Sequence, residues 1–239
     1  MSLPQTGPET ESRAKAQTTP TFVDFLCYRV EPSLRFLDPL TRDDALAEFT
    51  RLLATPGPGL EVRPYFTGGF RTDCDFFLWL IAKDPAAFPA FVSALWKTVV
   101  GKHLVAAHAF VGVTKPSPYL PGHLQHFERG PATDAYCFIY PFTKTHEWYQ
   151  LPLEKRRDIM KTHNEIGHQF PGVKINTTYQ FGIGDYDFML AFEASDFTEF
   201  SNLVQRLRET EARPYTAADT PLIMGVKKSA SELIESLSL

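Results

Sequence analysis

The chain has 239 residues, of which 44% are hydrophobic and 22% charged, a composition typical of a globular protein that can bury a core. Its formal net charge of −4 disfavours a general affinity for nucleic acid or anionic lipid, because both require a basic surface. Three scattered cysteines without a CxxC pair, and no apolar run of the roughly 18 residues that cross a bilayer, predict a cytoplasmic protein without a membrane span.

The amino-terminal stretch, residues 1–19, is polar and rich in Pro, Thr, Gln and Glu. It lacks the apolar segment of a secretory signal, so we predict a disordered arm. Residues 20–115 then predict an N-terminal domain in the order strand, helix, strand, strand, helix, strand. Residues 116–134 contain four prolines and predict a linker loop.

Residues 135–229 predict a second domain with the same order of elements. We expect strands at 136–141, 174–181, 186–192 and 221–226, and helices at 153–169 and 197–210. Pro171 and Gly172 act as stop signals for the first of these helices, and Asp196 is placed to cap the second.

The second domain repeats the first at an offset of about 112 residues. The run that begins at Asp75 aligns with the run that begins at Asp187, and in both a later Asp (Asp84, Asp196) precedes a helix with phenylalanines at matching places. A repeat of this length indicates a duplicated domain. The fold predicted is α+β: tandem ferredoxin-like repeats forming a dimeric α+β barrel. Each sheet would bury its apolar face against the other or against another subunit.

The helix at 153–169 carries a histidine on its apolar face. Ile159, His163, Ile166 and Phe170 follow the spacing i, i+4, i+7 and i+11, which places them on one side of a helix. By residue type alone, a hydrogen-bonded core histidine is the more common interpretation and a metal ligand the rarer one. The matching helix of the first domain, at 40–54, has no histidine, so duplication does not explain this residue.

Other side chains have ordinary interpretations when taken singly. His123 and His126 lie three apart in the linker and would form either part of a metal pair or an exposed loop. Tyr140 would be a core residue, and Trp148 would pack over the sheet. Glu211, near the end of the last helix, would be solvated.

The segment 140–163, YPFTKTHEWYQLPLEKRRDIMKTH, resembles the signature of the chlorite dismutase-like family, which includes coprohaem decarboxylases. In that pattern a Tyr-Pro precedes W-Y-x-L-P-x-E-x-R-R, and the iron-binding His lies fifteen residues after the Trp. Trp148 and His163 keep this spacing. The resemblance extends from about Thr21 to Lys227. It implies tandem ferredoxin-like domains, usually as homopentamers, with haem in the C-terminal half and His163 as its iron ligand.

The resemblance also implies roles for individual residues. Tyr140 matches a tyrosine that forms a radical and attacks a substrate propionate, and Lys144 matches a lysine that anchors a propionate. His123 matches the distal histidine of some decarboxylases by spacing, with His126 as its competitor. Arg208 resembles an anchoring arginine in the family's LR-x-x-E-A-R-x-Y segment.

Three further positions complete the expected cofactor site. Trp148 belongs to the signature itself. Asn176 stands thirteen residues after His163, where true chlorite dismutases carry an arginine. Glu211 is our candidate for the acceptor that fixes the other ring nitrogen of His163.

The activity implied is the hydrogen peroxide-dependent oxidative decarboxylation of iron-coproporphyrin III (coprohaem) to haem b. The alternatives are a haem b protein with weak peroxidase or chlorite activity and a non-enzymatic haem carrier or sensor. The expected partners are a porphyrin, hydrogen peroxide and further copies of the chain.

Overall fold

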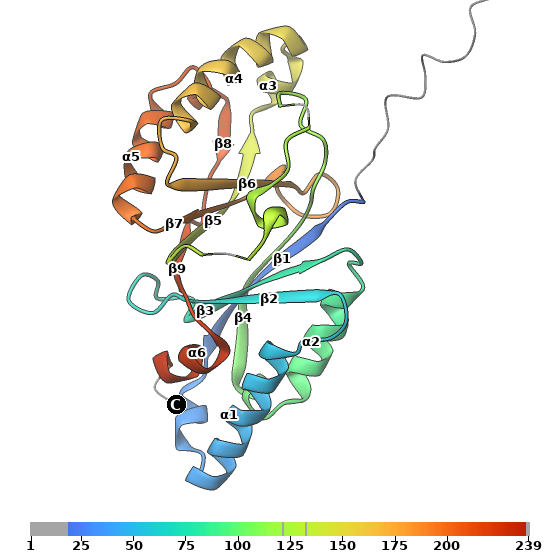
Figure 1. Cartoon of the computed structure of the whole chain (residues 1–239), viewed down its shortest axis with the longest axis vertical. Helices are drawn as coiled ribbons and strands as arrows, with labels where there is room; N and C mark the ends of the chain where they lie inside the picture. Colours follow the sequence, from blue (N-terminus) through green and yellow to red (C-terminus); the bar gives the residue numbers. More distant parts are fainter. Residues whose placement is uncertain (1–18, 121, 132, 238–239) are drawn as a thin grey trace, which may run out of the picture.

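The structure, a computed structural model, describes residues 19–120, 122–131 and 133–237. The predicted arm, residues 1–19, therefore lies outside the described residues apart from Thr19. The described chain forms two stacked halves, the N-terminal half below and the C-terminal half above in Figure 1.

The N-terminal half has the predicted ferredoxin-like order. Its elements are β1 (Phe22–Val30), α1 (Pro39–Ala54), β2 (Leu60–Phe66), β3 (Phe76–Ala82), α2 (Ala87–Lys97) and β4 (Leu104–Val113). Helix α1 begins where the Asp38 side chain accepts a hydrogen bond from the Thr41 amide, a standard N-cap. Strand β3 is buried along its whole length, because one of its faces packs under the helices and the other faces the barrel interior.

The C-terminal half repeats this order and adds short elements. They are β5 (Tyr136–Lys144), α3 (His146–Gln150), α4 (Leu153–Gly167), β6 (Val173–Tyr179), β7 (Phe188–Ala194), α5 (Phe197–Arg208), β8 (Thr216–Ala218), β9 (Ile223–Lys227) and α6 (Ala230–Ser236). Asp196 caps α5 through the Thr198 amide, as predicted. Strand β5 runs three residues beyond its predicted end because Thr143 and Lys144 pair with β8. The sequence did not predict α3, β8 or α6.

The strands of both halves form one sheet that closes on itself. Their order is β7–β6–β4–β1–β3–β2–β9–β5, and β5 pairs again with β7. The halves meet at two narrow seams, where Val113 of β4 pairs with Tyr179 of β6 and β2 pairs with β9 at Tyr65 and Phe66. The predicted barrel is thus confirmed, and each half buries its sheet against the other within one chain.

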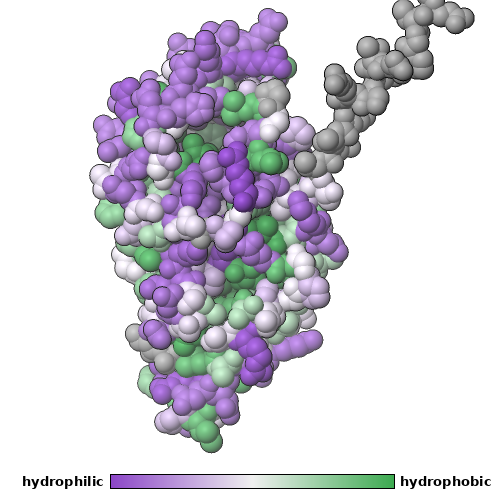
Figure 2. Space-filling model, in the orientation of Figure 1, coloured by the Kyte–Doolittle hydropathy of each residue, from purple (hydrophilic) through white to green (hydrophobic). Residues whose placement is uncertain are grey.

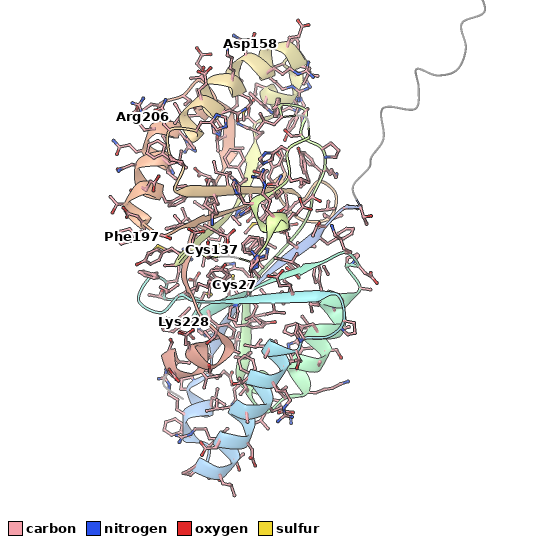
Figure 3. The ribbon with its side chains drawn as sticks, viewed as in Figure 1. Cys27, Cys137, Asp158, Phe197, Arg206 and Lys228 are labelled. Carbon is pink, nitrogen blue, oxygen red and sulfur yellow. The ribbon has the colours of Figure 1, made fainter. Side chains whose placement is uncertain are left out.

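Side chains alternate between the barrel interior and the helix layers. Cys27 of β1 and Cys137 of β5 both point into the interior, between the halves in Figure 3. Helices α4 and α5 cover the outer face of the C-terminal half, whereas α1, α2 and α6 cover the N-terminal half. Among the described residues, every helix is too short or too polar to traverse a lipid bilayer.

Candidate functional site

Tyr140 lies on the outer face of β5, beneath the α4–α5 layer. Its neighbour Ile139 faces the barrel interior, whereas Tyr140 joins the outer core. The Tyr140 ring stacks against Phe192 with 5.6 Å between ring centroids. Burial, more than the nearby Asp219 carboxylate, raises the pKa of Tyr140 well above its ordinary value. The phenol therefore keeps its proton at neutral pH.

His163 lies on α4, between the buried residues Ile159 and Ile166 of the same helix. Its Nδ1 atom is buried and has no hydrogen-bond partner among the described residues. Burial, and then the Lys144 charge, lower the pKa of His163 to about 4, because both disfavour the imidazolium. The imidazole is therefore neutral at pH 7 and can offer a lone pair to a metal.

Lys144 is the last residue of β5, and its position is fixed by a backbone contact. Its amide donates to Asp187 Oδ2 over 2.7 Å, and the Tyr149 hydroxyl donates to the same oxygen over 2.6 Å. Its ammonium nitrogen lies 4.4 Å from the Trp148 ring centroid and 5.2 Å from that of Phe142. Burial, followed by the nearby Arg213, lowers the pKa of Lys144 to about 8.

Two arginines share one carboxylate near the tyrosine. Asp219 Oδ2 lies 2.6 Å from Arg213 Nη1 and 3.3 Å from Arg208 Nη2. Asp219 raises the pKa of Tyr140, and the two arginines oppose that effect. The family resemblance predicted a role for Arg208 but not for Arg213, although both belong to the LR-x-x-E-A-R-x-Y segment.

Packing and charge link these groups, since Tyr140 shares one apolar cluster with Ile166, three residues after His163 on α4. Lys144 lowers the pKa of His163, Arg213 lowers that of Lys144, and Arg213 also acts on Tyr140. A protonated phenol and a neutral imidazole thus share a half-buried, cation-rich site between a helix and the outer face of the sheet. Such a site suits a large ligand with an apolar body and negatively charged groups.

Trp148 forms a wall of this region. It is 2% exposed, and its ring packs against Tyr119 of the linker and Tyr215, with centroid distances of 6.5 and 5.4 Å. The linker is tied to α4 nearby, since Arg157 Nε donates to the Pro118 carbonyl. Figure 2 shows apolar atoms recessed among polar side chains in this upper half.

The structure corrects the prediction for Asn176. In β6, Asn176 pairs with Ala191, which faces the barrel interior together with Ile139. Its side chain therefore lies on the face of the sheet opposite to Tyr140. The amide is 1% exposed and is occupied by hydrogen bonds within the barrel. Thr177, the next residue, points to the Tyr140 face instead, because it pairs with Leu190 as Tyr140 does.

The structure does not form the predicted bond between Glu211 and His163. Glu211 is exposed, and His163 Nδ1 lacks a partner in the part of the chain that is described. The expected acceptor for the second ring nitrogen is thus absent from this arrangement.

The two linker histidines differ in exposure. His123 is exposed, and His126 is half-buried at the start of a short 3-10 helix, His126–Arg129. Burial is the largest cause that lowers the pKa of each, followed by Arg129. Among the described residues, no contact joins either ring to Tyr140 or His163.

Two surface hollows lie elsewhere. One of about 550 Å³ is lined by residues 29–33, Arg35 and Asp75, and one of about 290 Å³ is lined by residues that include His108 of β4 and Asp185. Neither is lined by a predicted site residue. We place the candidate site at Tyr140 and His163 on the chemistry of the side chains rather than on the depth of these hollows.

The closed sheet of two ferredoxin-like repeats defines a duplicated α+β barrel protein. Its candidate ligand site, with a tyrosine, a neutral histidine and basic side chains, lies on the outer face of the C-terminal repeat. The chain belongs to the chlorite dismutase family, whose sequence model matches residues 42–228. The family predicted from the 140–163 segment is confirmed.

Relatives with two different activities are similar to this chain. A coprohaem decarboxylase of Mycolicibacterium smegmatis is 32% identical over 174 residues, covering 72% of this chain and 75% of that protein. A chlorite dismutase of Ideonella dechloratans is 27% identical over 238 residues, covering 95% and 84%. The solved structure of chlorite dismutase from Candidatus Nitrospira defluvii in complex with imidazole has the same fold, with a TM-score of 0.83, 22% identity and coverage of 92% and 95%.

Proposed function

We propose that this chain is a coprohaem decarboxylase, which uses hydrogen peroxide to convert coprohaem into haem b. The observation that carries the proposal is the shared site of the protonated Tyr140 phenol and the neutral His163 imidazole, with Lys144 and Arg213 beside them. The 32% identity to a coprohaem decarboxylase over 72% of the chain supports it.

The side chains present fit an iron porphyrin that bears carboxylates. His163 is neutral at pH 7 and would bind the iron, as imidazole commonly does in haem proteins. The Lys144 ammonium lies over the rings of Trp148 and Phe142 and would hold a propionate, as would Arg208 and Arg213 where they extend beyond Asp219. Aromatic rings of the outer sheet face and Trp148 would contact the macrocycle.

When bound, the iron porphyrin supplies the redox centre at which peroxide is reduced. Tyr140 would give up one electron and one proton, and would then take a hydrogen atom from the β-carbon of a propionate. Each round consumes one propionate, one peroxide and one proton, and yields one vinyl group, one CO2 and two waters. His123 would accept a proton from peroxide, since burial lowers the pKa of its imidazole and thereby keeps the ring neutral and able to act as a base at pH 7. Phenylalanine could not replace Tyr140, because it lacks the transferable O–H hydrogen.

The second candidate is a haem b protein with chlorite dismutase activity, which the Ideonella match over 95% of the chain favours. That activity is expected to need an arginine from the strand after the proximal helix. Strand β6, VKINTTY, contains no arginine on either face, so we favour decarboxylation. Cytoplasmic location and homopentameric assembly belong to the same proposal, since the family resemblance implies both.

One comparison tests the function directly. The purified chain is mixed with coprohaem and titrated with peroxide, and the porphyrin mass is followed. Wild-type protein should lose two carboxyl groups stepwise, whereas Tyr140→Phe should bind coprohaem and release no CO2. Tyr136→Phe is the matched control, because Tyr136 lies on the same face of β5 but packs against Phe197.

The outcomes separate the candidates. Full conversion by Tyr140→Phe would remove this residue from the reaction. Oxygen release from chlorite without loss of carboxyl groups would identify a chlorite dismutase. Coprohaem or haem binding without turnover of either substrate would identify a carrier.

A further inference from the structure

A second set of buried polar side chains lies inside the barrel, away from Tyr140. Arg63 of β2 is 5% exposed, Asn176 of β6 is 1% exposed and Glu193 of β7 is 2% exposed. Arg63 Nη1 and Glu193 Oε1 lie 3.7 Å apart, and one arginine from the N-terminal half thus faces two polar residues from the C-terminal half. Buried polar groups are costly unless they are paired, so the partners of this set are informative.

The set holds the linker against the barrel, with Phe127 in the interior cluster. The Phe127 amide donates to Asn176 Oδ1 over 3.0 Å. Arg63 Nη2 donates to the Phe127 carbonyl over 3.4 Å and to the Gly130 carbonyl over 3.2 Å. The Phe127 ring packs edge-on against Trp79 in the interior, with centroids 5.4 Å apart. Residues from both halves of the protein therefore contact the same linker residue, Phe127.

The Asn176 amide is held in one orientation. Its Nδ2 donates to Glu193 Oε2 over 3.1 Å while its Oδ1 accepts from Phe127. An aspartate would lose the donor and would place a second carboxylate beside Glu193. A leucine of similar size would lose both bonds.

A second bond joins the linker to the backbone of the same strand. The Thr177 amide donates to Gln125 Oε1 over 2.7 Å. Strand β4 pairs with β6 only at Val113 and Tyr179, so this stretch of β6 lacks a strand neighbour on that side. The linker takes the place of that neighbour and satisfies a backbone donor that would otherwise lack a partner.

These anchors lie next to the two linker histidines in the sequence. Gln125 is the N-cap residue of the short helix that begins at His126, and Glu128 completes a capping box with it. His126 thus stands between the anchored residues Gln125 and Phe127, and His123 lies two residues before Gln125. The path of the chain at both histidines depends on where the anchors hold it.

We propose that Asn176 and Gln125 are positioning residues, which fix the 122–131 segment and thereby the linker histidine that serves the porphyrin site. This inference rests on the proposed function. Asn176 cannot act by touching the ligand of Tyr140, because its side chain lies on the opposite face of the sheet. Strand β6 carries the anchor on one face and contributes Thr177 to the site on the other.

Hydrogen–deuterium exchange on the porphyrin-free chain tests the anchoring. In Asn176→Leu, the amides of residues 122–131 should exchange at least about tenfold faster than in wild type. The pKa values of His123 and His126, measured by NMR, should rise toward the ordinary histidine value as burial is lost. The control Asn202→Leu, at an exposed position of α5, should change neither the exchange rates nor the histidine pKa values. Gln125→Ala tests the second anchor if Asn176→Leu fails to fold, and unchanged exchange in a folded variant overturns the proposal.

Peroxide kinetics on the coprohaem-loaded chain test the positioning. Asn176→Leu should slow the peroxide reaction about as much as His123→Ala, or as His126→Ala if that residue is the distal one. The double variant should be no slower than the histidine variant, because both changes remove the same interaction. Coprohaem affinity should stay within about twofold of wild type. If the rate losses of the two single variants add up in the double variant, the positioning role is overturned. If wild-type protein binds no porphyrin, the proposed function fails, and the exchange experiment still decides the anchoring.

Discussion

The ammonium nitrogen of Lys144 lies 4.4 Å from the centroid of the Trp148 ring. Trp148 is the signature residue that locates His163 in the sequence, and Lys144 lowers the pKa of that histidine. The cation–π contact thus joins the end of β5 to the start of the helical segment that carries the proposed iron ligand. A ring face stabilises a cation without neutralising it, so the charge stays available to a carboxylate.

Removing the Lys144 charge should weaken coprohaem binding. Lys144→Met keeps most of the apolar stem and should raise the dissociation constant about tenfold, the size expected for one charge-assisted hydrogen bond. Titration of the Soret band measures this. Lys161→Met, at an exposed position of the same helix as His163, is the control and should bind like wild type.

The same lysine predicts a pH dependence of binding. The pKa of Lys144 is lowered to about 8, so in the free protein it is charged at pH 7 and largely neutral at pH 9. Coprohaem affinity should therefore fall as the pH rises through 8 in wild type, and this fall should shrink in Lys144→Met. If coprohaem affinity falls equally with pH in wild type and in Lys144→Met, Lys144 does not bind a carboxylate of coprohaem.

The iron ligand can be tested by ligand rescue. His163→Ala should take up coprohaem or haem b with an altered absorption spectrum, and added imidazole should restore the wild-type bands, because a free imidazole can occupy the space left by the side chain. His168→Ala is the control, since His168 is exposed at the end of the same helix. An unchanged spectrum in His163→Ala would contradict the proposed ligation.

His163 should also make folding stability sensitive to mild acid. Its pKa is about 4 in the folded chain and about 6.5 in an unfolded chain. Between these values the unfolded state binds a proton that the folded state does not, so stability falls as the pH drops from 6.5 toward 4. Between pH 7 and pH 5, the free energy of unfolding of His163→Leu should fall by about 1 to 2 kcal/mol less than that of wild type. Urea unfolding at both pH values measures the difference, and equal losses would show that this imidazole is not buried.

Closure of the barrel beside β9 should depend on a glycine. A methyl group at Gly225 would meet the side chains of Phe77 and Tyr65 at 2.8 Å, closer than carbon atoms pack. Gly225→Ala should therefore destabilise the fold by about 1–3 kcal/mol. Gly167→Ala is the matched control, because its new methyl would meet Ile175 at an ordinary 3.6 Å. If thermal unfolding shows that both variants are equally stable, the packing around Gly225 at the seam between β2 and β9 has room for a methyl group.

The sequence alone was sufficient to predict the duplicated fold and to group the central residues of the candidate site. The repeat, the order of strands and helices and the place of His163 on the apolar stripe of α4 all follow from periodicity, which depends on local backbone geometry. Tyr140, Lys144, Trp148 and His163 lie within one segment of 24 residues, 140–163, so a single resemblance was enough to group them.

What the tertiary structure decided was which face each residue takes and which segments meet. Asn176 and Thr177 are neighbours, yet one enters the barrel and the other faces the site, because a shift of one residue in a strand reverses the side chain. The spacing from His163 crosses a loop and could not fix that register. Arg213, the seams of the barrel and the anchored linker depend on contacts between residues far apart in the chain, which no local pattern encodes.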